Sequence, residues 1–352
     1  MKKKILITGG AGFIGTNLAL RLTKNYKVYS LDNFYKKESL NNLDKLTNNG
    51  VEFIKGDIRN LEFVENILQK EEFHSIFHFA AQVAMTKSIL DPQLDFEVNV
   101  QGTLNLLNAI KNSDLDTKFI NLSSNKVYGD LSWDKLVENP TRYTSLDHSE
   151  GYGEETKLDF LSPYGCSKGS AEQYVIDYSN TFGLQTISLR LSTIFGPNQY
   201  FTIDQGWIGW FINQYLIVKK DNDHIVDIQG NGKQVRDILY IDDLTALFEI
   251  ILEKNFNEMK TNYFNVGGGV KNSLSILELL NLLQDHFNSK IDININEKNW
   301  RVSDQKFYIS NLDNIKREFN WEPEMRINEK IYEYLNWIES NQILTNDKKK
   351  SL

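Results

Sequence analysis

A glycine motif near the start of the chain constrains the fold more than any other feature. It reads Thr8-Gly9-Gly10-Ala11-Gly12-Phe13-Ile14-Gly15. The motif joins a short apolar run, Ile5–Thr8, to an amphipathic helical pattern at 12–22. In such a strand–turn–helix unit, the first glycine turns the chain and the second admits a pyrophosphate to the backbone N–H groups. The third lets the helix pack closely on the sheet, and the helix N-terminus favours the same anion.

After this motif, strand-like and helix-like segments alternate. Short apolar runs occur at 27–31, 51–55, 75–79, 118–122 and 185–190, and helical patterns occur at 61–69, 94–111 and 163–182. This alternation predicts an α/β fold built on a doubly wound parallel sheet of the Rossmann type.

The second half of the chain has shorter, mixed elements. Helical patterns lie at 206–218, 241–253, 273–286 and 327–340, and a strand pattern lies at 263–266. We therefore predict a dinucleotide-binding Rossmann domain at 1–190 with an insertion at 129–162, a smaller mixed α/β substrate-binding domain at 191–340 with segments that return to the Rossmann core, and a flexible tail at 341–352. The insertion lacks periodicity, and it is open whether it acts as a lid or as a partner-contact loop.

Charge and cysteine content limit the classes of partner. Lys and Arg number 39 against 47 Asp and Glu, a net charge of −8, so the basic excess of a nucleic-acid binder is missing. The single cysteine, Cys166, excludes an internal disulfide framework, and we expect it to pack as a small apolar side chain. No apolar run reaches the roughly 18 residues of a membrane span. We expect a cytoplasmic protein with neither a nucleic-acid nor a membrane partner.

Residues at the ends of the predicted strands complete the cofactor groove. Asp32 ends the second strand, where a carboxylate accepts hydrogen bonds from the adenosine ribose and repels a 2′-phosphate, which favours NAD over NADP. Asp57 follows the third strand, and we expect its carboxylate to accept a hydrogen bond from the adenine amino group. Ala80 and Ala81 end the fourth, where small residues let a cofactor cross the sheet edge.

A tyrosine and a lysine point to hydride-transfer chemistry. Tyr164 and Lys168 lie four residues apart in the predicted helix 163–182, so both project from one face. A phenol with a pKa of about 10 is a poor base near neutral pH. We expect the Lys168 ammonium and a positive nicotinamide to lower that pKa. Ser124, at the carboxyl end of the sheet, supplies a hydrogen bond to the substrate oxygen.

Together these residues resemble a known family. The Gly9–Gly15 motif, Asp32, Ser124 with Val127-Tyr128-Gly129, and Tyr164-Gly165-Cys166-Ser167-Lys168 are similar to the extended short-chain dehydrogenase/reductase family of nucleotide-sugar epimerases and dehydratases. The segment 189–197 also fits, although members commonly carry Asn where Thr193 stands. The resemblance covers about residues 3–340. It implies a tightly held NAD, no metal, a nucleotide-diphosphate sugar as substrate, and a homodimer or homotetramer.

Local strings narrow the choice within the family. The 4,6-dehydratases carry an Asp-Glu pair after the hydroxyl residue, whereas this chain has Asn125-Lys126, so the acid and base for expelling water are missing. Strings at 82–86, 124–130, 141–144, 158–160 and 204–211 resemble a subgroup of 2-epimerases that act on CDP-linked 3,6-dideoxyhexoses. That subgroup carries Thr at position 124, and Ser keeps the hydroxyl.

The resemblance also assigns the remaining site residues. The segments Gly230–Asp237 and Arg301–Gln305 are similar to those whose arginines, here Arg236 and Arg301, clamp the substrate pyrophosphate with bidentate guanidinium groups. The predicted cofactor-binding residues are Gly9, Gly12, Phe13, Ile14, Gly15, Asp32, Asn33, Asp57, Ile58, Ala80, Ala81, Gln82, Asn99, Tyr164 and Lys168. The predicted substrate-binding residues are Met85, Ser88, Ser124, Asn125, Thr193, Gln205, Gln234, Arg236 and Arg301.

The implied reaction is inversion at carbon 2 of the sugar through a transient 2-keto intermediate, in the service of polysaccharide biosynthesis. Ser124, Tyr164 and Lys168 are its predicted catalytic residues. Two alternatives stay open. The same residues suit a 4-epimerase acting on a UDP- or CDP-hexose, and a cofactor-binding regulator without catalysis is the third reading.

Overall fold

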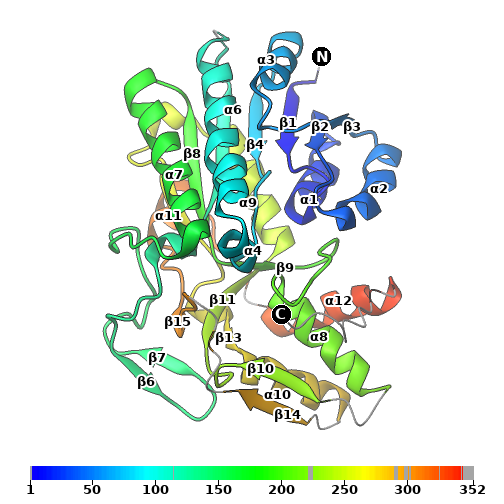
Figure 1. Cartoon of the computed structure of the whole chain (residues 1–352), viewed down its shortest axis with the longest axis vertical. Coiled ribbons are helices and arrows are strands. Elements are labelled where there is room, and N and C mark those ends of the chain that lie inside the picture. Colours follow the sequence, from blue (N-terminus) through cyan, green and yellow to red (C-terminus); the bar gives the residue numbers. More distant parts are fainter. Residues whose placement is uncertain are drawn as a thin grey trace.

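The computed structural model describes residues 2–113, 115–220, 225–288, 292–296, 300, 303–324, 326–341 and 343. Its centre is a seven-stranded sheet in the order β12-β8-β5-β4-β1-β2-β3, with every neighbouring pair parallel (Figure 1). The strands are β1 (Lys4–Thr8), β2 (Lys27–Asp32), β3 (Glu52–Lys55), β4 (Ser75–His78), β5 (Lys118–Ser124), β8 (Thr186–Leu191) and β12 (Tyr263–Val266). The predicted doubly wound Rossmann sheet is confirmed.

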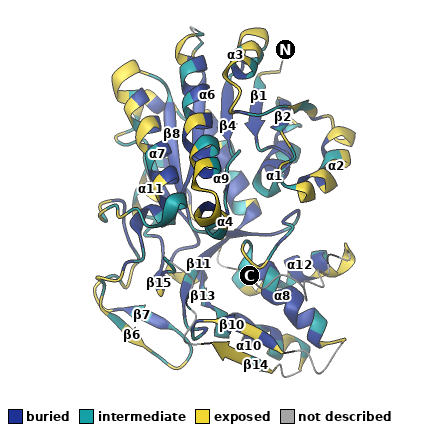
Figure 2. Ribbon diagram, viewed as in Figure 1, coloured by how far each residue is buried: buried dark blue, intermediate teal, exposed yellow. Residues whose placement is uncertain are grey.

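Both faces of the sheet are covered, because side chains alternate along each buried strand. On β1, Ile5 and Ile7 join the apolar core under α1 (Phe13–Leu22) and α9 (Ile241–Glu253). Leu6, between them, points into a second core on the opposite face. The helices on that side are α3 (Leu61–Lys70), α6 (Gly102–Lys111) and α7 (Ser162–Phe182). Figure 2 shows buried strands between helices whose outer faces are exposed.

The order of strands reverses beside β1. From β1 the chain proceeds to β2 and β3 on one side, and β4, β5, β8 and β12 extend on the other. Ligands of open α/β sheets bind in the crevice at such a switch point, outside the carboxyl ends of the strands. The glycine motif follows β1 directly, so the fold places it in this crevice.

The remaining strands and helices form a smaller, mixed part of the molecule, seen below the main sheet in Figure 1. One sheet contains β9 (Thr193–Phe195), β11 (Val235–Tyr240), β13 (Ser273–Ser275) and β15 (Phe307–Tyr308), and another pairs β10 (Val226–Gln229) with β14 (Ile293–Asn296). Its helices are α8 (Trp207–Val218), α10 (Ile276–Phe287) and α12 (Ile327–Ser340). Two segments from this half, α9 and β12, pack on the main sheet instead.

Shorter elements complete the fold. They are α2 (Leu43–Asn48), α4 (Met85–Leu90), α5 (Pro92–Phe96), α11 (Asp313–Phe319), and the short helical turns Lys37–Asn42, Asn125–Tyr128, Phe256–Glu258 and Val270–Asn272. The single helix predicted at 94–111 is divided: α5 leads through a π-helical turn, Glu97–Gln101, into α6. The helix predicted at 273–286 begins later, at Ile276, because β13 precedes it and Ser275 caps it. The expectation that Cys166 is packed is wrong, because its position on α7 is exposed.

The insertion 129–162 is more ordered than its sequence indicates. It contains a hairpin of β6 (Leu136–Glu138) and β7 (Tyr143–Ser145). Arg142 pairs with Glu278 of α10 at 2.7 Å, and Lys233 pairs with Glu138 at 2.7 Å. These contacts fasten the hairpin to the smaller part of the molecule. Of the predicted tail, only residues 341 and 343 are described. Within the described residues, no helix is both long and apolar enough to cross a bilayer.

Candidate active site

A cavity of about 450 Å³ lies at the carboxyl ends of the central strands. Most of the residues predicted from the sequence line it. They are Gly9, Gly12, Phe13, Ile14, Gly15, Asp32, Asn33, Asp57, Ile58, Ala80, Ala81, Gln82, Ser124, Tyr164, Lys168, Thr193 and Gln205. The fold therefore brings together segments almost 200 residues apart in the sequence.

The glycines form a cradle that fits a diphosphate. A Cβ on Gly9 would lie 2.7 Å from the Ala80 nitrogen, and one on Gly15 would lie 2.5 Å from the Gly9 carbonyl oxygen, so both positions require glycine. A Cβ on Gly12 would meet only that carbonyl oxygen, at 3.1 Å, and would otherwise project into open space. Among the described residues, no side chain caps the N-terminus of α1, which leaves its first N–H groups for an anion.

Asp32 and Asp57, the two carboxylates predicted to contact adenosine, line the cavity beside this cradle. The two Asp32 oxygens accept from the backbone nitrogens of Phe34 at 2.8 Å and Ala11 at 3.3 Å, which holds the carboxylate at the end of β2. Burial raises the pKa of Asp32, and these N–H groups oppose the rise. Asp57 accepts from the Asn33 side chain at 3.0 Å, so two predicted adenosine residues are joined.

Asn99 lies behind the cavity wall rather than on it. Its side chain holds Gln82 from both sides: Oδ1 accepts from the Gln82 backbone nitrogen at 2.9 Å, and Nδ2 donates to the Gln82 carbonyl at 3.0 Å. Nδ2 also donates to Ser167 Oγ at 2.9 Å. Asn99 thus supports the cofactor wall and connects it to α7, and no contact with the cavity was found.

Tyr164, Lys168 and Ser124 meet at the cavity, but their electrostatics differ from the expectation. Lys168 donates to the Leu122 carbonyl, and burial lowers its pKa to about 8. Burial raises the pKa of Tyr164 to about 12, with a hydrogen bond to Ser124 opposing the rise. The expected lowering of the Tyr164 pKa is not seen in this chain alone, because desolvation outweighs the hydrogen bond with Ser124 and the charge of Asp95 adds to the rise.

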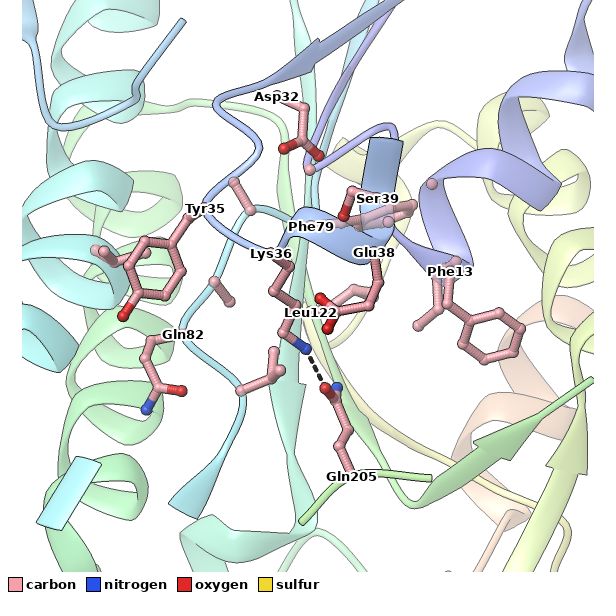
Figure 3. Close-up of a pocket in the computed structure, with 18 of the residues that line it drawn as sticks. Phe13, Asp32, Tyr35, Lys36, Glu38, Ser39, Phe79, Gln82, Leu122 and Gln205 are labelled. Carbon is pink, nitrogen blue, oxygen red and sulfur yellow. Dashed lines mark hydrogen bonds between the residues drawn. The ribbon is translucent and has the colours of Figure 1, made fainter. Parts of the chain in front are cut away.

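The cavity wall includes a lysine that the sequence analysis missed. Lys36, in the loop after β2, donates to the side chain of Gln205 across the cavity (Figure 3). Burial lowers the pKa of Lys36 to about 8. Thr193 also lines this region and accepts from Trp207 Nε1 at 3.3 Å. The position of Lys36, four residues after Asp32, was the only available signal in the sequence.

Five of the predicted substrate residues that the structure describes lie outside the cavity wall: Met85, Ser88, Asn125, Gln234 and Arg236. Ser88 accepts from the Tyr164 backbone nitrogen at 3.1 Å and donates to the Met85 carbonyl at 2.7 Å, so it fixes the start of α7. Asn125 donates to Gln305 at 3.1 Å, and Gln234 donates to the Gln229 carbonyl at 3.0 Å. These contacts make Met85, Ser88, Asn125 and Gln234 parts of the scaffold around the site in this structure.

Arg236, one of the two residues of the predicted phosphate clamp, does not line the cavity. Arg236 donates to Asp304 at 2.7 Å and to its neighbour's carbonyl, that of Val235, at 2.7 Å. The guanidinium is therefore already paired, and it does not line the cavity. Arg301, the second predicted clamp residue, lies outside the described residues.

A buried ion pair behind α7, the helix that carries Tyr164 and Lys168, was also missed. Arg190 on β8 and Glu172 on α7 are 2.6 Å apart and almost fully buried. Arg190 donates to the Tyr128 hydroxyl at 2.7 Å as well. The pair joins α7 to the sheet one helical turn beyond Lys168. In the sequence, the only sign of this ion pair was an arginine inside the apolar run 185–190.

Comparison with known proteins gives consistent results. A family model described as GDP-mannose 4,6 dehydratase matches residues 6–334. CDP-paratose 2-epimerase of Salmonella typhi is 43% identical over 339 residues, covering 96% of this chain and 99% of that protein.

Solved structures match along the whole chain. UDP-N-acetylglucosamine 4-epimerase from Methanobrevibacter ruminantium superposes with a TM-score of 0.80 at 26% identity, covering 97% of this chain and all of that one. UDP-glucuronic acid 4-epimerase from Bacillus cereus, in complex with UDP-glucuronic acid and NAD, gives 0.78 at 28% identity, with coverage of 96% and 99%.

Proposed function

Because the chain belongs to the family of NAD-dependent nucleotide-sugar epimerases and dehydratases, we propose that it inverts carbon 2 of CDP-paratose to give CDP-tyvelose. The observation that carries this proposal is the 43% identity over nearly its full length to a CDP-paratose 2-epimerase. The two 4-epimerases among the solved structures described above are only 26% and 28% identical to this chain. Asn125-Lys126 in place of a carboxylate pair supports epimerisation over dehydration.

The catalytic roles follow from the groups around the cavity. NAD, when bound, supplies the hydride acceptor and a positive charge that lowers the pKa of a nearby phenol. Tyr164 takes the proton of the sugar hydroxyl and later returns it. Ser124 donates a hydrogen bond to the reacting oxygen, and the Lys168 ammonium provides the local positive charge. Each of the three lines the cavity.

Inversion also requires the oxidised sugar to present its other face. A 2-keto sugar is flat at the reacting carbon, and it is held through its nucleotide end while it turns. The diphosphate then needs cationic partners, which Arg236 and Arg301 would supply. Because Arg236 is paired with Asp304, substrate binding must displace or share that ion pair.

A 4-epimerase acting on a UDP- or CDP-hexose is the second candidate. The solved neighbours with TM-scores of 0.80 and 0.78 are 4-epimerases, which favours it. A regulator that has lost catalysis is less consistent with the site, since Ser124, Tyr164 and Lys168 all reach one cavity.

Sugar NMR after incubation tests these readings. The purified protein is incubated with CDP-paratose and, separately, with UDP-galactose. We expect conversion of CDP-paratose to CDP-tyvelose and no reaction of UDP-galactose. Conversion of UDP-galactose alone would establish the 4-epimerase, and inertness towards both with NAD present would overturn the proposed function.

A further inference from the structure

Asp95 is a buried carboxylate for which the mechanism above has no use. It lies on α5 with 0% of its surface exposed. Burying a carboxylate is costly unless nearby donors or charges compensate. A buried acid beside a catalytic helix therefore calls for an explanation.

Amide groups from the cofactor wall compensate one of its oxygens. Oδ1 accepts from Gln82 Nε2 at 2.9 Å and from Asn99 Nδ2 at 3.3 Å. Oδ2 has no hydrogen bond of good geometry within the part of the chain that is described. Only Oδ1 is thus well paired. The nearby Ser167 hydroxyl and the Gln82 amide both lower the pKa of Asp95 against the rise by burial, and no contacting cation in that part of the chain neutralises its charge.

The same amides lead to the catalytic helix. Asn99 sits in the π-helical turn after α5, a type of turn that is common at functional sites. It donates to Ser167 Oγ at 2.9 Å, and the Ser167 hydroxyl donates to the Tyr164 carbonyl at 3.2 Å. Ser167 directly precedes Lys168. Asp95, Asn99 and Ser167 therefore connect one buried charge to the two predicted catalytic residues of α7.

The charge of Asp95 acts on both of those residues. It opposes the lowering by burial of the pKa of Lys168, and it adds to the rise by burial of the pKa of Tyr164. Lys168 in turn opposes the raised pKa of Asp95, whose first cause is burial. Removing this charge should lower the pKa of both Tyr164 and Lys168.

We propose that Asp95 is a positioning residue for the reaction: held by Gln82 and Asn99, its carboxylate keeps the Lys168 ammonium charged and restrains the ionisation of Tyr164. This inference rests on the proposed function only for its kinetic consequence. The hydrogen bonds that support it involve this chain alone.

Other charged groups near α5 are accounted for elsewhere. On α7, Glu172 is paired with Arg190 at 2.6 Å. In the π-helical turn, Glu97 is half exposed and pairs with Arg59 at 3.2 Å. On α4, Lys87 lines the cavity and lies over the Tyr35 ring.

Asp95→Asn separates charge from hydrogen bonding. The amide oxygen of Asn can still accept from Gln82 and Asn99, while the negative charge is gone. Asp91→Asn is the matched control, since Asp91 caps the same short helix and Asn caps equally well. We expect Asp95→Asn to move both limbs of the pH profile of kcat/KM to lower pH. The acid limb reports loss of the Tyr164 proton, and the alkaline limb reports loss of the Lys168 proton.

A spectroscopic titration gives an answer that does not depend on turnover. The absorbance of ionised tyrosine is recorded against pH for the protein and for Tyr164→Phe, and the difference isolates Tyr164. The same subtraction in the Asp95→Asn background should give a midpoint at lower pH. The Asp91→Asn background should leave it unchanged.

Either of two results would overturn the proposal. The first is a titration midpoint of Tyr164 that is unchanged in the folded Asp95→Asn protein. The second is a lower rate without any shift in the two limbs of the pH profile, which would indicate a purely structural role. Failure of the proposed function looks different. The unmodified protein would then convert neither sugar nucleotide, while the titration would still decide the role of Asp95.

Discussion

The proposed base is a single phenol, and its removal is the simplest test at the scale of one residue. Tyr164→Phe should lower the rate of epimerisation by about 10²–10⁴-fold, because proton transfer by a positioned group is worth that much. NAD should stay bound, since the Gly9–Gly15 cradle is untouched; it is measured in the supernatant of denatured protein. Tyr174→Phe, a half-exposed position on the same helix, is the control. A variant within tenfold of normal would remove Tyr164 as the base.

Arg236 provides a second test at this scale. If the resemblance assigns it correctly, Arg236→Ala should raise KM for the sugar nucleotide by about tenfold or more and change kcat little, because a charged hydrogen bond to phosphate is lost. Steady-state kinetics measure both values. If KM were unchanged and the melting temperature fell, Arg236 would serve only to stabilise the fold through its ion pair with Asp304.

Individual residues differ in how far the sequence reveals them. Tyr164 and Lys168 are predictable because their spacing in one helix fixes their relative position. Contacts such as Lys36 with Gln205 are not, because 169 residues separate the partners and only the fold brings them together. Burial is also hidden at this level, which is why the pKa of Tyr164 is higher than expected.

Secondary-structure elements show the same division. The strands of the Rossmann half are predictable because each is a short apolar run, and its longer helices because they show an apolar period, whereas the six-residue helices α2 and α4 are too short to show one. The π-helical turn at 97–101 is not predictable, since one additional residue per turn barely alters the pattern of 94–111. The hairpin in 129–162 has strands of three residues each, too short for a period to register.

The β6–β7 hairpin yields a prediction at the scale of an element. Its tie to α10 runs through Arg142, which binds both oxygens of Glu278. Arg142→Ala should weaken this attachment by about 1–2 kcal/mol and speed cleavage within 129–162 by thermolysin. Lys135→Ala, at an exposed position beside β6, is the control. In the unaltered protein a nucleotide sugar should not slow this cleavage; strong protection by the ligand would instead identify a lid.

The whole molecule has an apolar surface that suits self-association. Leu90 is 78% exposed, and Ile89 and Phe96 are 45% and 49% exposed, all on α4 and α5. We expect a homodimer or homotetramer that buries them. Light scattering should show Leu90→Asp shifted towards the monomer, while Leu146→Asp, on the insertion, keeps the native mass. A monomeric native protein at all concentrations would exclude the assembly.

At this scale the path of the chain has one more consequence. Strand β12 is the edge strand of the main sheet and pairs with β8. Helix α9 packs beside α1 on the same face of that sheet. A truncated polypeptide ending near residue 190 would expose the ladder of β8 and a bare patch of apolar side chains, both of which invite aggregation. We therefore expect that residues 1–190 do not fold stably alone, and that the main sheet is completed only after the chain as far as residue 266 has been synthesised.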